Sequence, residues 1–300
     1  MNNVCITIDT EGDSPDQKKP SYLGIEMVLP SMLNLFSRYR IRATFFLQQD
    51  AIHRVGTCFP SFWKKVEAEG HEIGLHVHGL IGKPIGEKRE IILGGLNRLR
   101  SIGLNVVSFR GGRYHFDHDL VEFLEMNGIR NDSSVVPVLE ERNEDGTERC
   151  NHIGTPINPS YFSYKDQGGP GTSRILELPI NRYPFFKSNV WAGILTGREV
   201  NDEVLFDYFS EIRRDQLIVV DMHAWDGLRT IVRDMNKNKK FALIISPLYF
   251  FRRLIGSGFF VNDGYFFRLE SFLKYLAEQR GARFLTIREA GEAIRPSLSR

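Results

Sequence analysis

The 300-residue sequence contains 42% hydrophobic and 25% charged residues, which is the balance of an ordinary globular protein. The length suits one large domain or two ordinary ones, and the composition excludes a collagen-like, coiled-coil or wholly disordered chain. The 39 Lys and Arg residues nearly cancel the 37 Asp and Glu residues. The resulting formal charge of +2 gives no general electrostatic reason to expect nucleic acid as a partner.

Cysteine usage and the first residues indicate the cellular compartment. The sequence has an odd number of cysteines, which lie far apart: Cys5, Cys58 and Cys150. We therefore expect neither a disulfide framework nor a zinc site made of cysteines. Residues 1–13 turn acidic without a basic start followed by an apolar run, so no secretory signal is expected. We therefore expect a protein of the cytoplasm, either free or at the inner face of the membrane.

Short apolar segments alternate with longer segments of helical periodicity, a pattern typical of strand–helix units around a parallel sheet. The expected strands cover residues 4–8, 42–47, 71–78, 106–110, 175–180, 216–222 and 283–286. The expected helices cover residues 25–38, 60–70, 88–102, 117–127, 201–213, 268–280 and 287–294. Because no shift of composition marks a boundary, we predict that residues 1–300 form a single α/β barrel domain.

Residues 140–173 break this alternation with polar sequence that contains Gly and Pro. The segment is too long for an ordinary connection, so we predict a functional loop or a hairpin insertion.

Residues 241–260 form the most apolar stretch, and a basic run precedes them at 233–240. Pro247, Arg252 and Arg253 within the stretch disfavour a membrane span. One interpretation is a buried strand or helix after a solvated loop. The other is peripheral contact with a membrane surface through residues 233–260.

Two strand ends carry residues that could bind a metal. Asp9, Glu11 and Asp13 follow the first strand and share a face if the chain stays extended. His76 and His78 end the third, and an extended chain directs both imidazoles to the same side. Zinc and similar divalent ions take neutral imidazole and carboxylate together. The alternatives are a capping role for the acids and hydrogen-bonded structural roles for the histidines.

Two later strand ends also carry polar residues. Arg110 precedes Gly111 and Gly112, which let the backbone approach a ligand, although a salt bridge beside a glycine turn is the alternative. His223 could act as acid or base if a carboxylate lies beside it, although a structural histidine is the alternative. Trp225, two residues later, is the aromatic side chain that we expect to contact the substrate.

In order and spacing these motifs resemble those of the polysaccharide deacetylases of carbohydrate esterase family 4, also called NodB-homology proteins. Residues 7–12 resemble the family's Thr-Phe-Asp-Asp-Gly motif, and residues 72–76 resemble its Glu-Ile-Gly-Asn-His motif. Arg110-Gly111-Gly112 resembles the family's arginine motif, and Asp132-Ser133-Ser134 resembles its Asp-Ser-Ser segment. Glu177-Leu178-Pro179 and Asp221-Met222-His223 fall where the family's fourth and fifth motifs are expected. The resemblance implies a distorted (β/α)7-type barrel that hydrolyses an N-acyl group, most often acetyl, from an amino sugar.

The resemblance also implies roles for single residues. Asp9 would take a proton from the attacking water, Arg110 would orient Asp9, and His223 would protonate the leaving amine. A backbone N–H after the turn at Gly111 and Gly112 would help to bind the oxyanion.

Glu11, His76 and His78 would hold a divalent metal, for which we expect zinc. The sequence departs from the family at Thr10, where a second aspartate is common, and at Leu80, where a second histidine is usual. Glu11 and His78 would then replace these ligands, although Asp9 and Glu11 could exchange roles.

A nucleotide-linked or lipid-linked amino sugar fits a cytoplasmic enzyme better than a finished cell-wall polymer, and it indicates surface-polysaccharide or lipopolysaccharide biosynthesis. Two alternatives stay open. One is a deformylase or another amidase on the same barrel. The other is a carbohydrate-binding protein that has lost the metal chemistry, made plausible by the departures at Thr10 and Leu80.

Overall fold

The computed structural model describes residues 3–13, 22–51, 59–137, 139–142, 148–163, 171–181, 216–228, 261–279 and 281–298. The predicted helix at 201–213 and the apolar and basic segment at 233–260 lie outside these residues.

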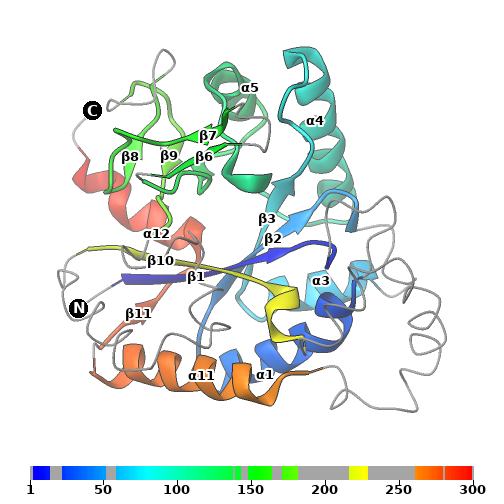
Figure 1. Ribbon diagram of the computed structural model, residues 1–300, viewed down its shortest axis with the longest axis vertical. Helices are drawn as coiled ribbons and strands as arrows, with labels where there is room; N and C mark the ends of the chain where they lie inside the picture. Colours follow the sequence, from blue (N-terminus) through cyan, green and yellow to red (C-terminus); the bar gives the residue numbers. More distant parts are fainter. Residues whose placement is uncertain are drawn as a thin grey trace.

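One curled, mostly parallel sheet forms the centre of the protein (Figure 1). Its strand order is β10-β1-β2-β3-β4-β5-β9-β8, and β11 also pairs with β1. The strands are β1 (Asn3–Thr10), β2 (Ala43–Gln48), β3 (Glu72–Val77), β4 (Ser108–Gly111), β5 (Asn131–Asp132), β8 (Ser160–Tyr161), β9 (Leu176–Glu177), β10 (Ile218–His223) and β11 (Arg283–Phe284). The pairs are parallel except for β8 with β9. Within the described residues the sheet stays open, which is the distorted form of the predicted (β/α)7-type barrel.

Helices connect the strands and pack outside the sheet (Figure 1). They are α1 (Leu29–Arg38), α3 (Phe59–Ala68), α4 (Ile85–Ser101), α5 (Val121–Met126), α11 (Asp263–Lys274) and α12 (Ile287–Ile294). In α1 the buried residues Leu29, Met32 and Phe36 recur at helical spacing and form the face that packs on the core. Helices α1 and α11 lie side by side, and an ion pair of 3.1 Å joins Arg38 to Glu270. No helix in the described part of the chain is long and apolar enough to cross a membrane.

Helix α12 packs against the edge of the sheet where β2, β3 and β5 begin. Thr286 and Glu289 form a reciprocal capping box at its first turn. The backbone N–H of Arg288 donates to the buried carboxylate of Glu72 at the start of β3, with a distance of 2.8 Å. Gly291 lies so close to β5 that a Cβ atom there would be 2.3 Å from Oδ1 of Asn131.

Most predicted strands and helices are confirmed, with changed bounds. The helix predicted at 117–127 divides into a short 3-10 turn, His118–Leu120, and α5. The strand predicted at 175–180 pairs only over β9. Within 140–173, β6 (Glu140–Arg142) and β7 (Glu148–Asn151) pair as an antiparallel hairpin. Of the two structures expected for this segment, a functional loop or a hairpin insertion, the described residues form the hairpin.

Candidate metal and catalytic site

Parallel pairing brings the predicted site residues to one edge of the sheet. Asp9 on β1 is in register with His223 on β10. On the other side of β1, His76 on β3 is in register with Arg110 on β4. Because the carboxyl ends of parallel strands lie at the same edge, four motifs that are distant in sequence become neighbours.

Glu11, His76 and His78 form a compact cluster whose potential ligand atoms lie within 4.8 Å of one another. Nε2 of His76 is 3.1 Å from Oε2 of Glu11 and 2.9 Å from Nε2 of His78. Oε2 of Glu11 also contacts Nε2 of His78. Glu11 and His76 are only 2% and 1% exposed, so both side chains are buried from water.

The tautomer of His76 indicates that this cluster fits a divalent metal. Nδ1 of His76 lies 3.1 Å from the carbonyl oxygen of Arg110. Because a carbonyl only accepts hydrogen bonds, Nδ1 carries a hydrogen, and Nε2 is the ring nitrogen that faces Glu11 and His78. Two imidazole nitrogens and a carboxylate oxygen that converge in this way fit a divalent cation. A histidine oriented by a carbonyl through its other nitrogen is the usual arrangement around protein-bound metals.

The charge of Glu11 suits a metal ligand. Burial by itself raises the pKa of a carboxyl group, but hydrogen bonds with His76 and His78 outweigh it and hold the pKa of Glu11 well below its usual value. Glu11 therefore stays ionised.

Asp13, the other candidate acid, has a different role. Its two carboxylate oxygens accept hydrogen bonds from the backbone N–H groups of Leu23 and Gly24, each at 2.8 Å. These contacts fix the chain where it enters a helical turn. The structure therefore separates Glu11, which belongs to the candidate metal cluster, from Asp13, which caps the turn at Leu23 and Gly24.

Asp9 is held between Arg110 and the metal cluster. Nη1 of Arg110 lies 2.8 Å from Oδ1 of Asp9, and Oδ2 of Asp9 lies 3.7 Å from Nε2 of His76. Burial raises the pKa of Asp9, but His76 and Arg110 outweigh burial and keep it below its usual value. An ionised carboxylate with one oxygen fixed and the other beside the cluster has the geometry of a general base.

The Asp-Ser-Ser motif supports Arg110, which is fully buried. Its Nε–H donates to the carbonyl oxygen of Ser133 at 2.7 Å, and Nη2 donates to Oγ of Ser133 at 2.9 Å. The backbone N–H of Gly111 donates to Oγ of Ser134 at 2.9 Å. This loop therefore fixes the orientation of the guanidinium.

Asp221 and Tyr114 belong to the same network, although the sequence predicted no role for either side chain. Oδ1 of Asp221 lies 2.5 Å from Nη1 of Arg110, and the hydroxyl of Tyr114 donates to Oδ2 of Asp221 at 3.1 Å. Burial and the nearby Asp9 raise the pKa of Asp221 to about 6. The period-two rule could have found Asp221, because it shares a strand face with His223. No such signal existed for Tyr114, which lies after a turn.

The turn that carries Tyr114 is strained. Arg113 and Tyr114 have φ angles of 57° and 56°, in the left-handed region that non-glycine residues seldom adopt. Such conformations cost about 1–3 kcal/mol each and cluster at functional sites. Here they place Arg113 and Tyr114 in the wall of a cavity that Glu11, His76 and His78 also line.

His223 lies on the other side of the cluster. Its Nε2 is 3.6 Å from Oε1 of Glu11, and its Nδ1 is 3.6 Å from Oδ2 of Asp226. Burial opposes protonation, but Asp226 and then Glu11 outweigh it and raise the pKa of His223 above its usual value. The ring also lies 4.5 Å, between centroids, from that of Trp225. A protonated imidazole in this position can donate a proton.

These groups line a cavity of about 220 Å³. Liquid water occupies about 30 Å³ per molecule, so the cavity has room for a small acyl group and its attachment but not for a whole polymer. The hairpin insertion contributes Glu141 to its wall. The lining residues are Asp9, Glu11, His76, His78, Arg113, Tyr114, Glu141, His223 and Trp225.

Gly111 and Gly112 were predicted to contact the substrate, but they are not among the residues that line the cavity. The N–H of Gly111 is already bonded to Ser134. At Gly112 a Cβ atom would lie 2.6–2.8 Å from three ring atoms of His78, so this glycine makes room for a residue of the metal cluster. That a backbone N–H after the turn binds the oxyanion stays a prediction.

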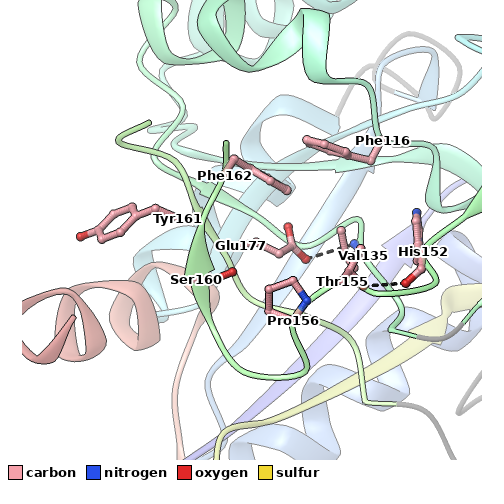
Figure 2. A pocket seen from close by; sticks show the side chains of 9 residues that line it. All are labelled: Phe116, Val135, His152, Thr155, Pro156, Ser160, Tyr161, Phe162 and Glu177. Atoms are coloured by element: carbon pink, nitrogen blue, oxygen red, sulfur yellow. Dashed lines mark hydrogen bonds between the residues drawn. The ribbon is translucent and has the colours of Figure 1, made fainter. Parts of the chain in front are cut away.

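The Glu-Leu-Pro motif lies outside the catalytic cavity. Figure 2 shows Glu177 in the wall of a separate cavity of about 10 Å³, below the side chains of Phe116 and Phe162. Oε1 of Glu177 accepts a hydrogen bond from the N–H of Val135 at 3.1 Å. Burial and the neighbouring Asp132 raise the pKa of Glu177 well above its usual value. Glu177 therefore holds the loop behind Arg110 through its bond to Val135.

No family model matches this sequence, and no curated protein matches it. Solved structures do match. A protein assigned as a polysaccharide deacetylase from Mycobacterium smegmatis superimposes with a TM-score of 0.62 at 16% identity, over 99% of this chain and 93% of that one. A protein assigned as a glycoside hydrolase or deacetylase from Parabacteroides distasonis gives 0.67 at 14% identity, over 99% of this chain and 72% of that one.

The chain has the fold of the polysaccharide deacetylases. The fold implied by the sequence motifs is thus confirmed. The same fold also occurs in Puue allantoinase, which superimposes with a TM-score of 0.55 at 13% identity, over 98% of this chain and 90% of that one. At these identities the comparisons establish the architecture, and the chemistry must be argued from the site itself.

Proposed function

We propose that the protein is a metal-dependent hydrolase that removes an N-acyl group, most often acetyl, from an amino sugar. The observation that carries this proposal is the buried cluster of Glu11, His76 and His78 beside Asp9, with Asp9 held by Arg110. A metal-ligand set and an oriented base in one cavity are the two parts with which a metal-dependent amidase hydrolyses an unactivated amide.

A divalent ion held by Glu11, His76 and His78, for which zinc is the first candidate, would polarise the acyl carbonyl and make a water molecule more acidic. Oδ2 of Asp9 takes the proton of the attacking water while Arg110 holds Oδ1. The C–N bond of the tetrahedral intermediate then breaks, and His223 gives its proton to the departing nitrogen. The products are a carboxylate and a free amino sugar.

The cavity wall supports a sugar as the substrate. Trp225 offers an aromatic ring beside His223, and such rings stack on the apolar faces of sugars. A cavity of this size takes the acylamino group while the rest of the substrate extends outside. A nucleotide-linked or lipid-linked amino sugar, used by a cytoplasmic enzyme of surface-polysaccharide or lipopolysaccharide synthesis, fits this arrangement.

The small cavity also favours a second candidate function, an amidase that acts on a formyl sugar or a small cyclic amide on the same barrel. The third possibility, a binding protein without metal chemistry, rested on Thr10 and Leu80. Leu80 is a buried core residue, and His78 takes part in the cluster in its place. Glu11 likewise replaces an acid at position 10. These substitutions support a retained metal site.

A substrate panel with matched variants tests the proposal. Metal content and release of acetate or formate would be measured on acetylated and formylated amino sugars and on cyclic amides. The wild-type protein should hold one divalent ion and release acetate from an amino sugar, and His76→Ala should lose both properties. His118→Ala removes an imidazole outside the cavity and should retain both. A metal-free wild type that still binds sugar as His76→Ala does would refute the hydrolase.

A further inference from the structure

Two acidic side chains lie next to each other inside the sheet, Asp132 on β5 and Glu177 on β9. The two residues are in register on parallel strands, so both side chains lie on the same face of the sheet. Asp132 is 0% exposed and Glu177 is 3% exposed. Because a buried charge is costly unless a partner neutralises it, two carboxyl groups in this position need a special arrangement.

One oxygen of each carboxyl group holds the same loop. Oδ1 of Asp132 accepts the backbone N–H of Ser134 at 2.8 Å, and Oε1 of Glu177 accepts that of Val135 at 3.1 Å (Figure 2). The other two oxygens, Oδ2 of Asp132 and Oε2 of Glu177, are buried, and no N–H group of the described residues donates to them. A hydrogen bond links the two carboxyl groups themselves. Because ionised carboxylates only accept, this bond needs a hydrogen on one of them.

The charges around the pair also favour one neutral carboxyl group. Arg110 on β4 is a cation that acts on both Asp132 and Glu177. Its Nη1, however, already donates to Asp9 and to Asp221. A single guanidinium therefore faces four buried carboxyl groups, and one positive charge cannot neutralise them all.

Other titratable groups approach the pair from the neighbouring elements. His152 and Tyr161 line the small cavity beside Glu177. Burial lowers the pKa of His152 to about 4, so its imidazole is neutral at neutral pH. A phenol carries no positive charge. Arg295 donates to Asn131, whose side chain lies on the opposite face of β5 from the pair.

The loop held by the pair is the one that orients Arg110. Nε and Nη2 of Arg110 donate to the carbonyl oxygen and to Oγ of Ser133, at 2.7 and 2.9 Å. Ser133 immediately precedes Ser134 and Val135, whose N–H groups the pair binds. A continuous series of contacts thus leads from the pair through this loop to Arg110 and on to Asp9.

We propose that Asp132 and Glu177 share one proton, and that the resulting hydrogen bond positions Arg110 and, through it, the carboxylate of Asp9. Neither acid of the pair lines the catalytic cavity, so both are positioning residues. Burial and then Asp132 raise the pKa of Glu177 well above its usual value, which agrees with a retained proton. Only the effect of the pair on turnover rests on the proposed function.

Infrared spectroscopy of the metal-loaded protein tests the shared proton. Glu177→Gln and Asp132→Asn each replace the bridging O–H by an amide N–H in a group of the same shape, and each removes the protonated carboxyl group. At about pH 8, above the pKa of about 6 of Asp221, the wild type should show the C=O band of a buried carboxylic acid that both variants lack. Glu122→Gln changes an exposed carboxyl group and should keep this band. Equal bands in the wild type and in both amide variants would overturn the proposal.

Solvent exchange of the Arg110 Nε–H, followed by NMR, tests the positioning. The double variant Asp132→Asn/Glu177→Gln sets two amide donors against each other, and it breaks the bond without a change of size. Exchange should become at least about tenfold faster, the factor that corresponds to one lost buried hydrogen bond, while each single variant keeps the wild-type rate. Wild-type exchange in the double variant would contradict the positioning role.

Turnover separates this inference from the proposed function. If the wild type releases acetate, the double variant should lose kcat with little change in KM and should retain its metal, because Asp9 is displaced while the metal ligands are untouched. Each single variant should keep most of kcat, and a double variant with wild-type kcat would contradict the role of the pair. If the wild type releases no acetate, the proposed function fails, and the infrared and exchange measurements still decide the shared proton and the position of Arg110.

Discussion

Replacement of Gly112 by alanine should displace His78 and weaken metal binding. The added Cβ atom would lie 2.6, 2.7 and 2.8 Å from three ring atoms of His78. Ordinary contacts to a Cβ atom begin near 3.4 Å, so the ring must move by about 0.8 Å. Metal–ligand distances tolerate only about 0.2 Å, so a shift of this size breaks the coordination geometry.

We expect Gly112→Ala to lose at least about tenfold in metal affinity, the lower limit seen when ligand orientation is disturbed. Competition with a chromogenic chelator measures this affinity directly. The φ angle at Gly112 is not in the left-handed region, so the alanine backbone itself adds no strain. Gly86→Ala is the control, because a Cβ atom there meets nothing within 4 Å. Wild-type metal affinity in Gly112→Ala would refute the account of His78.

Three further predictions concern single residues. Asp9→Asn should retain the metal and lower kcat by about 10²–10⁴-fold, the usual contribution of a general base; unchanged turnover would exclude Asp9 from that role. Asp221→Asn should lower the free energy of unfolding by about 3 kcal/mol in denaturant titration, because one partner of a buried ion pair is lost; an unchanged midpoint would contradict this network. Burial lowers the pKa of His152 to about 4, so protonation of the unfolded chain destabilises the fold as the pH falls from 6.5 to 4. The loss is about 3 kcal/mol, and His152→Asn should flatten the dependence of stability on pH over that range.

The motifs that lie on strands could be predicted from the sequence. The alternation of side chains along a strand placed His76 and His78 on one face, and parallel pairing placed the strand ends at one edge. Sequence spacing alone left Glu11 and Asp13 equivalent as candidate metal ligands. The difference comes from Leu23 and Gly24, whose N–H groups take the Asp13 carboxylate.

Contacts between distant segments could not be predicted in this way. Tyr114 reaches Asp221 through a turn after β4 in which Arg113 and Tyr114 adopt left-handed backbone conformations. No local sequence pattern predicts that turn. Gly112 was assigned to ligand contact because glycines admit close approach. The structure uses that property, but the group that approaches is the ring of His78.

The central claim is that Glu11, His76 and His78 together hold one divalent ion beside Asp9. Anomalous diffraction at the zinc edge from crystals grown with zinc tests this claim most directly. The account predicts one strong peak at about 2.0–2.2 Å from Oε2 of Glu11 and from Nε2 of both histidines. A map without a peak at this cluster, or with the only zinc bound elsewhere, would contradict it.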